Sequence, residues 1–149
     1  MTAHIVSGYF ATFHEGHKEY IESVVSKLKD DDYLIVIIAN KKQFRLKYND
    51  YEPADLSIIR YPIYELLANR NIPVYFEVAS DTEDTTICKT LEHIIKERKA
   101  DKYILYKDGG EYNKKNLPEK DVKGIEFVFL KNKKIASASN ILNIEKRGE

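Results

Sequence analysis

Two histidines, His14 and His17, lie three positions apart in the segment GYFATFHEGHKEYI at residues 8–21. The segment follows an apolar run typical of a strand and continues into a pattern typical of a helix. Imidazoles at such a junction can bind a metal, stabilise a core or donate to a phosphate. A zinc site of the HExxH type needs a second histidine where Lys18 stands, and the single cysteine, Cys88, excludes a multi-cysteine site. A phosphate site and a purely structural pair are the two interpretations left.

The phosphate interpretation depends on the helix that we expect to begin near Gly16. The unpaired amides and the dipole at a helix N-terminus attract anions, and a glycine lets a ligand approach the backbone closely. Imidazole N–H groups there can meet the charge that builds up during phosphoryl transfer. The chain contains neither GxxxxGK[ST] nor GxGxxG, so its phosphate site would be of a different design.

The distribution of charge narrows the class of ligand. The chain carries 24 basic and 24 acidic side chains, and this balance argues against a general nucleic-acid binder. Two basic segments, KKQFRLK at residues 41–47 and LKNKK at residues 130–134, are compatible with a small polyanion. The acidic runs at residues 29–32 and 81–84 are interpreted as solvated surface, which is also the alternative for the basic runs.

Short strand patterns alternate with longer helix patterns along the chain. We expect strands at 4–10, 33–39, 72–79, 102–106 and 125–130, and helices at 16–28, 54–69, 83–98 and 136–145, with Pro62 kinking or interrupting the second helix. This order predicts an α/β fold, a Rossmann-like three-layer structure around a parallel sheet of about five strands, in one domain spanning residues 1–149.

Ligands of such sheets bind beyond the carboxyl ends of the strands, near the switch point of the topology. The segments expected to emerge there are 10–17, 40–48, 80–82, 107–113 and 131–139. The paired histidines and most of both basic segments fall among them, which favours a binding role for the basic residues.

Composition adds expectations about location. Hydrophobic residues make up 43% and charged residues 32% of the 149 residues, as is typical of globular proteins. No stretch approaches the roughly 18 apolar residues of a membrane span. We see no secretory signal at the N-terminus, and the single cysteine permits no internal disulfide. We therefore expect a cytoplasmic protein without a membrane partner.

GYFATFHEGH resembles the signature of the cytidylyltransferase-like nucleotidyltransferases, a glycine-x-phenylalanine-aspartate run that ends in HxGH. Within that group the likeness is greatest to the glycerol-3-phosphate cytidylyltransferases. It covers most of the chain, because further segments resemble the family's second strand and loop, middle helix, base-binding strand and closing motif: DDYLIVIIANKKQF, DLSIIRY, KYILYKDGG and LKNKKIASASNIL. The family joins a nucleoside triphosphate to a phosphorylated small molecule, releases pyrophosphate, usually uses Mg²⁺ and commonly forms dimers.

The resemblance implies catalytic roles for His14 and His17, which would contact the triphosphate and stabilise charge at the α-phosphorus. Lys47 would match the lysine of the family's second loop, unless a neighbour does so: Lys41, Lys42 or Arg45.

The remaining positions that match the family imply nucleotide contacts. Ser137 and Ser139 would hold the β- and γ-phosphates, Lys131 would replace the family's basic residue, and Asp108 would lie near the base or ribose. The first motif and the second loop supply the other expected nucleotide contacts: Gly8, Tyr9, Phe10, Gly16 and Lys41.

The chain also departs from the family's pattern. Ala11 stands where the family has an aspartate, Tyr9 stands where it has a threonine, and KIASAS has alanines at two hydroxyl positions. We therefore expect an active enzyme with a shifted substrate, with CTP as the favoured nucleotide and a homodimer as a possible assembly. The alternatives are an adenylyltransferase of the same fold and a nucleotide-binding protein that has lost catalysis.

Overall fold

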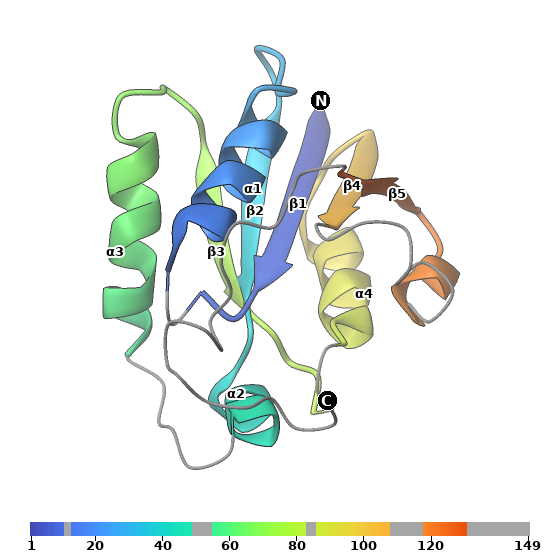
Figure 1. Cartoon of the computed structure of the whole chain (residues 1–149). Helices are drawn as coiled ribbons and strands as arrows, with labels where there is room; N and C mark the ends of the chain where they lie inside the picture. The colour runs from blue at the N-terminus through green and yellow to red at the C-terminus, as the bar shows by residue number, and fades with distance from the viewer. Residues whose placement is uncertain (11–12, 49–54, 83–85, 108–117, 131–149) are drawn as a thin grey trace.

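A five-stranded parallel sheet runs through the centre of the computed structural model, which describes residues 1–10, 13–48, 55–82, 86–107 and 118–130 (Figure 1). In the order β3-β2-β1-β4-β5, the strands are β3 (Val74–Val78), β2 (Tyr33–Ile38), β1 (Thr2–Gly8), β4 (Lys102–Lys107) and β5 (Ile125–Phe129). All four ladders are parallel, with β1 in the middle. The predicted α/β Rossmann-like fold is thereby confirmed.

Helices cover both faces of the sheet and make it the middle of three layers. Helices α1 (Glu15–Val25) and α3 (Leu56–Leu67) pack on one face through apolar side chains such as Ile21 and Ile63. Helix α4 (Cys88–Glu97) packs on the other face through Leu91 and Ile94. The short α2 (Lys41–Tyr48) lies beyond the carboxyl ends of the strands, and a 3₁₀ turn, η2 (Pro118–Asp121), precedes β5 (Figure 1).

Helix α2 is absent from the sequence prediction, which treats residues 40–48 as a loop. Its start is fixed by a reciprocal pair of hydrogen bonds. The Gln43 N–H donates to Asn40 Oδ1 at 2.8 Å, and the Asn40 N–H donates to Gln43 Oε1 at 3.1 Å. This is a capping box, which satisfies two donors that a helix start would otherwise leave unpaired.

Helix α3 continues through Pro62, so the predicted interruption is wrong. Proline removes the N–H that would bond the Ile58 carbonyl. Ile58 lies on the exposed side of the helix, where water can replace the lost donor. The predicted terminal helix at 136–145 lies outside the described residues. Within the described part of the chain, no helix is both long and apolar enough to cross a membrane.

Strands β1 and β4 separate toward their carboxyl ends. Their ladder stops at Ile5–Leu105, whereas the ladder between β1 and β2 continues to Gly8–Ile38. The Tyr20 hydroxyl of α1 lies between the separating strands: it accepts from the Ser7 N–H at 3.1 Å and donates to the Tyr106 carbonyl. This opening is the switch point of the topology, where open α/β sheets bind their ligands.

A buried polar group lies in the half of the sheet nearer the amino ends of the strands. The two nitrogens of His4 contact Asp32 Oδ2 at 2.9 Å and the Tyr106 hydroxyl at 2.7 Å, and Asp32 also accepts from the Thr2 and Lys29 amides. Burial opposes ionisation of Asp32, but these hydrogen bonds prevail and lower its pKa to about 2. Asp32 is therefore not the solvated surface residue that the acidic run predicts; it is buried and fully partnered.

Candidate functional site

The start of α1 lies just after the carboxyl end of β1, the central strand of the sheet, and His14 is its N-cap residue. His14 Nδ1 accepts from the Gly16 N–H at 3.0 Å and from the His17 N–H at 3.4 Å. Because Nδ1 accepts, the neutral ring carries its proton on Nε2. The imidazole therefore accepts hydrogen bonds from the first amides of the helix. Its Nε2–H group is polarised by these amides and by the positive end of the helix dipole.

The two imidazoles of the HxGH segment lie face to face. The ring centroids of His14 and His17 are 3.8 Å apart, and the ring planes differ by 20°. Phe10 meets His17 edge-on at 4.9 Å between centroids, and Phe13 lies at 5.7 Å on a tilt. The aromatic neighbours restrict the orientation of His17, and the stack brings both rings to the same turn.

Gly8 and Phe10 shape the backbone that leads to this turn. A Cβ atom at Gly8 would lie 3.1 Å from the Phe10 ring, closer than ordinary van der Waals contact. The glycine therefore allows the ring of Phe10 to fold back over the end of β1, where it is buried. Tyr9, between them, turns instead toward α2 and meets the Tyr48 ring edge-on at 5.7 Å.

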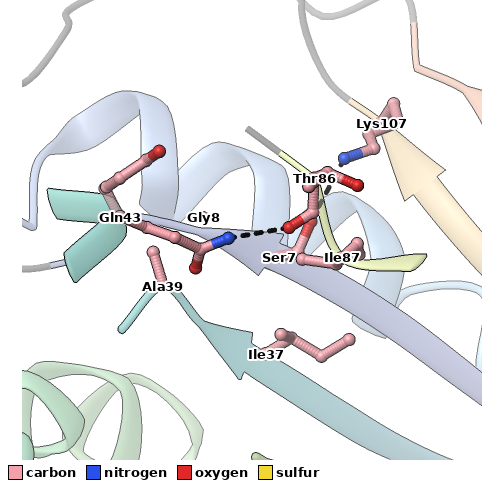
Figure 2. A pocket seen from close by; sticks show the side chains of 9 residues that line it. Ser7, Gly8, Ile37, Ala39, Gln43, Thr86, Ile87 and Lys107 are labelled. Carbon is pink, nitrogen blue, oxygen red and sulfur yellow. Dashed lines mark hydrogen bonds between the residues drawn. The ribbon is translucent and has the colours of Figure 1, made fainter. Parts of the chain in front are cut away.

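A cavity of about 210 Å³ opens at the switch point, beside the end of β1 (Figure 2). It is lined by residues from the ends of β1, β2 and β4 and from the starts of α2 and α4: Ser7, Gly8, Tyr9, Ile37, Ala39, Gln43, Thr86, Ile87 and Lys107. Gln43 Nε2 donates to the Thr86 carbonyl at 2.8 Å across it. Ile37, Ala39 and Ile87 give the cavity an apolar side.

Lys107 is the cation of this cavity. Its ammonium lies 3.4 Å from Ser7 Oγ and 3.9 Å from Glu119 Oε1, and only 19% of its side chain is exposed. Glu119, in η2, is completely buried and accepts from the Ile87 N–H at 3.3 Å. Burial lowers the pKa of Lys107, and the Glu119 charge opposes that shift. The end of β4 thus holds a poorly solvated ammonium with two long contacts.

The start of α4 is closed by acidic and hydroxyl side chains. Asp81 accepts from the Lys89 N–H at 2.9 Å and from the Thr90 N–H at 3.1 Å, while Glu119 accepts from the Ile87 N–H. Asp81 also accepts from the Thr90 hydroxyl at 2.7 Å and is buried. The interpretation of residues 81–84 as solvated surface is therefore wrong for Asp81, because the residue caps a helix.

The other predicted site residues divide into two groups. Lys41 is exposed at the first position of α2, and Lys47 lies in the last turn of the same helix, where the prediction has a loop. The remaining four lie outside the described residues: Asp108, Lys131, Ser137 and Ser139.

Sequence reasoning missed Lys107 and Glu119. Lys107 directly follows the apolar run KYILY and begins the segment 107–113 that is expected at the binding edge, so its position carried a usable signal. Glu119 carried none, because it is one acid in a charged stretch and its burial depends on the tertiary fold.

No group of three metal-ligating side chains occurs in the part of the chain that the structure describes. The start of α1 offers imidazoles and backbone amides, whereas Mg²⁺ prefers carboxylate, phosphate and water oxygens. We therefore assign no protein ligand to Mg²⁺ among the described residues.

A scan of the chain against protein-family models finds no match, and a search among curated proteins finds none either.

Proposed function

We propose that this chain is a nucleotidyltransferase that joins a nucleoside triphosphate, with CTP favoured, to a phosphorylated small molecule and releases pyrophosphate. The observation that carries the proposal is the stacked pair His14 and His17 at the first turn of α1, beside the switch point. This is the place in an open α/β sheet where a phosphate would meet the positive end of a helix and side-chain donors together.

The geometry suggests a role for each imidazole. The amides of Gly16 and His17 donate to His14 Nδ1, which polarises the ring and makes Nε2–H a stronger donor. That N–H is the group we assign to an oxygen on the α-phosphorus. His17, held by Phe10 and stacked on His14, is assigned to a neighbouring phosphate oxygen.

The proposed reaction needs no covalent intermediate on the protein. A phosphate oxygen of the acceptor attacks the α-phosphorus in line, a new P–O bond forms, and the bond to pyrophosphate breaks. Because the acceptor phosphate is already ionised, no general base is required. The chain's contribution is to position the two substrates and to stabilise the charge that gathers around the α-phosphorus.

Pyrophosphate release tests this proposal. The wild type is incubated with CTP, ATP, GTP or UTP, Mg²⁺ and a panel of phosphorylated alcohols, sugars and coenzyme precursors. We expect release with at least one pair, lost in His17→Ala and kept in His93→Ala, since His93 lies exposed on α4. Release with ATP alone would favour the adenylyltransferase alternative. Nucleotide binding without release from any pair would favour the non-enzymatic one.

We also propose that two copies of the chain associate through α3 and the edge strand β3. Exposed apolar side chains gather on α3 and on the neighbouring β3: Ile58, Tyr61, Tyr64 and Val78. Such residues on a sheet edge favour protein contacts. Sedimentation velocity at micromolar concentration should detect a dimer that Tyr61→Ser weakens. A monomer throughout would contradict the proposal.

A further inference from the structure

The cavity at the switch point contains a buried cation whose contacts are incomplete. Charge-assisted hydrogen bonds in proteins are about 2.7–2.9 Å long. Lys107 has contacts of 3.4 Å to Ser7 Oγ and 3.9 Å to Glu119 Oε1, and no shorter one among the described residues. An ammonium has three N–H donors, so at least one is left for another acceptor.

Two other buried charges, on Asp32 and Asp81, show what a completed arrangement looks like. Asp32 has contacts of 2.9–3.0 Å to the Thr2 and Lys29 amides and to His4, and Asp81 has contacts of 2.7–3.1 Å to α4. Neither residue lines the cavity. Lys107, in contrast, lies in the cavity wall, and Glu119 behind it completes the arrangement only partly, because Glu119 Oε2 has no hydrogen-bond partner among the described residues. Since a poorly solvated charge is costly unless it is paired, Lys107 is suited to a ligand that supplies the missing acceptor.

The rest of the wall limits the ligand. Ser7 adds a hydroxyl beside the ammonium, and Ile37, Ala39 and Ile87 form an apolar side. The volume of about 210 Å³ is below that of common drug-sized sites, so the occupant is small. A small molecule with one oxyanion and a short carbon stem matches this wall. The carboxylate of Glu119 lies behind the ammonium and weakens its field without filling the cavity.

We propose that Lys107 and Ser7 bind an oxyanion, phosphate monoester or carboxylate, of a small organic acceptor in this cavity. The term acceptor rests on the nucleotidyltransferase proposal; the binding itself does not. The cavity begins at Ser7–Tyr9, the same stretch of chain that leads to His14. An acceptor held at Lys107 would therefore lie at the edge of the sheet where the triphosphate is proposed to bind, and Lys107 would select acceptors by their charge.

Calorimetric titration with inorganic phosphate, glycerol 3-phosphate and glycolate tests the inference and separates the two oxyanions. We expect the wild type to bind at least one of them. Glu119→Gln should bind it more tightly, because the competing carboxylate is gone while Oε1 still accepts from the Ile87 N–H. The double variant Lys107→Met with Glu119→Gln should bind it about tenfold more weakly or worse. Lys102→Met, which changes an exposed lysine of the same strand, should match the wild type.

Two results would overturn the inference: no binding to the wild type at concentrations up to about 20 mM, or equal affinity in the wild type and the double variant. If the double variant fails to fold, Glu119→Gln decides alone, because unchanged or weaker binding there contradicts the charge competition. Triphosphate binding is measured in the same samples. A chain that binds triphosphate but no small oxyanion refutes only the Lys107 site, and a chain that binds the oxyanion through Lys107 but no triphosphate refutes only the proposed function.

Discussion

The helices that follow β1 and β3 begin at the same edge of the sheet, yet their first amides are satisfied in different ways. At the start of α1 the acceptor is a neutral imidazole, that of His14. At the start of α4 the acceptors include two carboxylates, those of Asp81 and Glu119. Both helices direct a positive dipole end to this edge. At α1 the capping acceptor is neutral, and the negative charge of the first turn is on Glu15, whose side chain is exposed.

This difference indicates which helix start suits an anion. A phosphate approaching the Lys89 and Thr90 amides of α4 would meet the buried carboxylate of Asp81 and its repulsion, whereas Glu119 lies 3.9 Å from the Lys107 ammonium. A phosphate approaching α1 would meet an imidazole that already receives two amides and carries a proton on its far nitrogen. The presence of a helix N-terminus therefore does not by itself predict an anion site. The charge of the side chains that cap the helix decides whether an anion is attracted or repelled.

The largest expected effect lies at α1. Replacement of His17 by alanine, or of His14 by asparagine, should lower turnover by about two to three orders of magnitude, as the loss of one charge-stabilising donor does. Pyrophosphate release measures it, with His93→Ala as the matched histidine control. Near-normal turnover in both variants would contradict the proposal that the start of α1 is the catalytic one of the two helix starts.

The largest expected loss of stability lies at α4. Asp81→Ala leaves the Lys89 and Thr90 amides and the Thr90 hydroxyl without their acceptor, and we expect the free energy of unfolding to fall by about 3 kcal/mol. Urea denaturation measures the change, and Glu92→Ala on the exposed side of α4 is the control. At temperatures where the variant stays folded, turnover should persist. A stability equal to the control's would contradict the capping role.

Asp32, a buried carboxylate away from both helix starts, serves as a comparison, because we assign it a role in stability and none in binding. Asp32→Asn should lower the free energy of unfolding by about 2 kcal/mol at pH 7, because the folded pKa of about 2 lies below the ordinary value of 3.8. The stabilisation is present above pH 3.8 and is lost as the pH falls toward 2. The wild type and the variant should therefore converge in acid, and a difference that stays constant would contradict the assignment.

The smallest effect separates the two functions of His14. His14→Ala removes the N-cap and should cost about 1 kcal/mol of stability. Asparagine is a favoured N-cap residue, so His14→Asn should retain most of that stability while it loses the imidazole. Thermal unfolding compares the two variants. Equal melting temperatures would mean that the ring contributes nothing as a cap.

The sequence predicts the strands well, because a buried parallel strand is a run of apolar residues with few competing interpretations. It places β2 at 33–39, against Tyr33–Ile38 in the structure. Helix starts are less certain: helix 83–98 begins five residues later, at Cys88, where Asp81 and Glu119 supply its acceptors. Helix α2 was missed because its apolar pattern is weak, although the Asn40–Gln43 spacing contains a capping box.

The candidate site was predictable only where local spacing defines it. His14 and His17 are brought together by one helical turn, which spacing describes. The contact of Lys107 with Ser7 spans 100 residues, and that of Lys107 with Glu119 depends on how η2 packs against the sheet. Asp32 and Asp81 look like solvated charges in their acidic runs, because burial is a property of the fold and not of the run.

The contrast between the two helix starts can be tested most directly by following backbone amides during a titration of the ¹⁵N-labelled chain with CTP, ATP, GTP and UTP. The amides of Gly16 and His17 at α1 should shift strongly and saturably with at least one triphosphate, because a phosphate binds beside their acceptor. The chemical shifts of the Lys89 and Thr90 amides, which donate to Asp81, should not change. Shifts at α4 without shifts at α1, or no saturable shift with any of the four nucleotides, would contradict the proposal that the start of α1 binds a triphosphate.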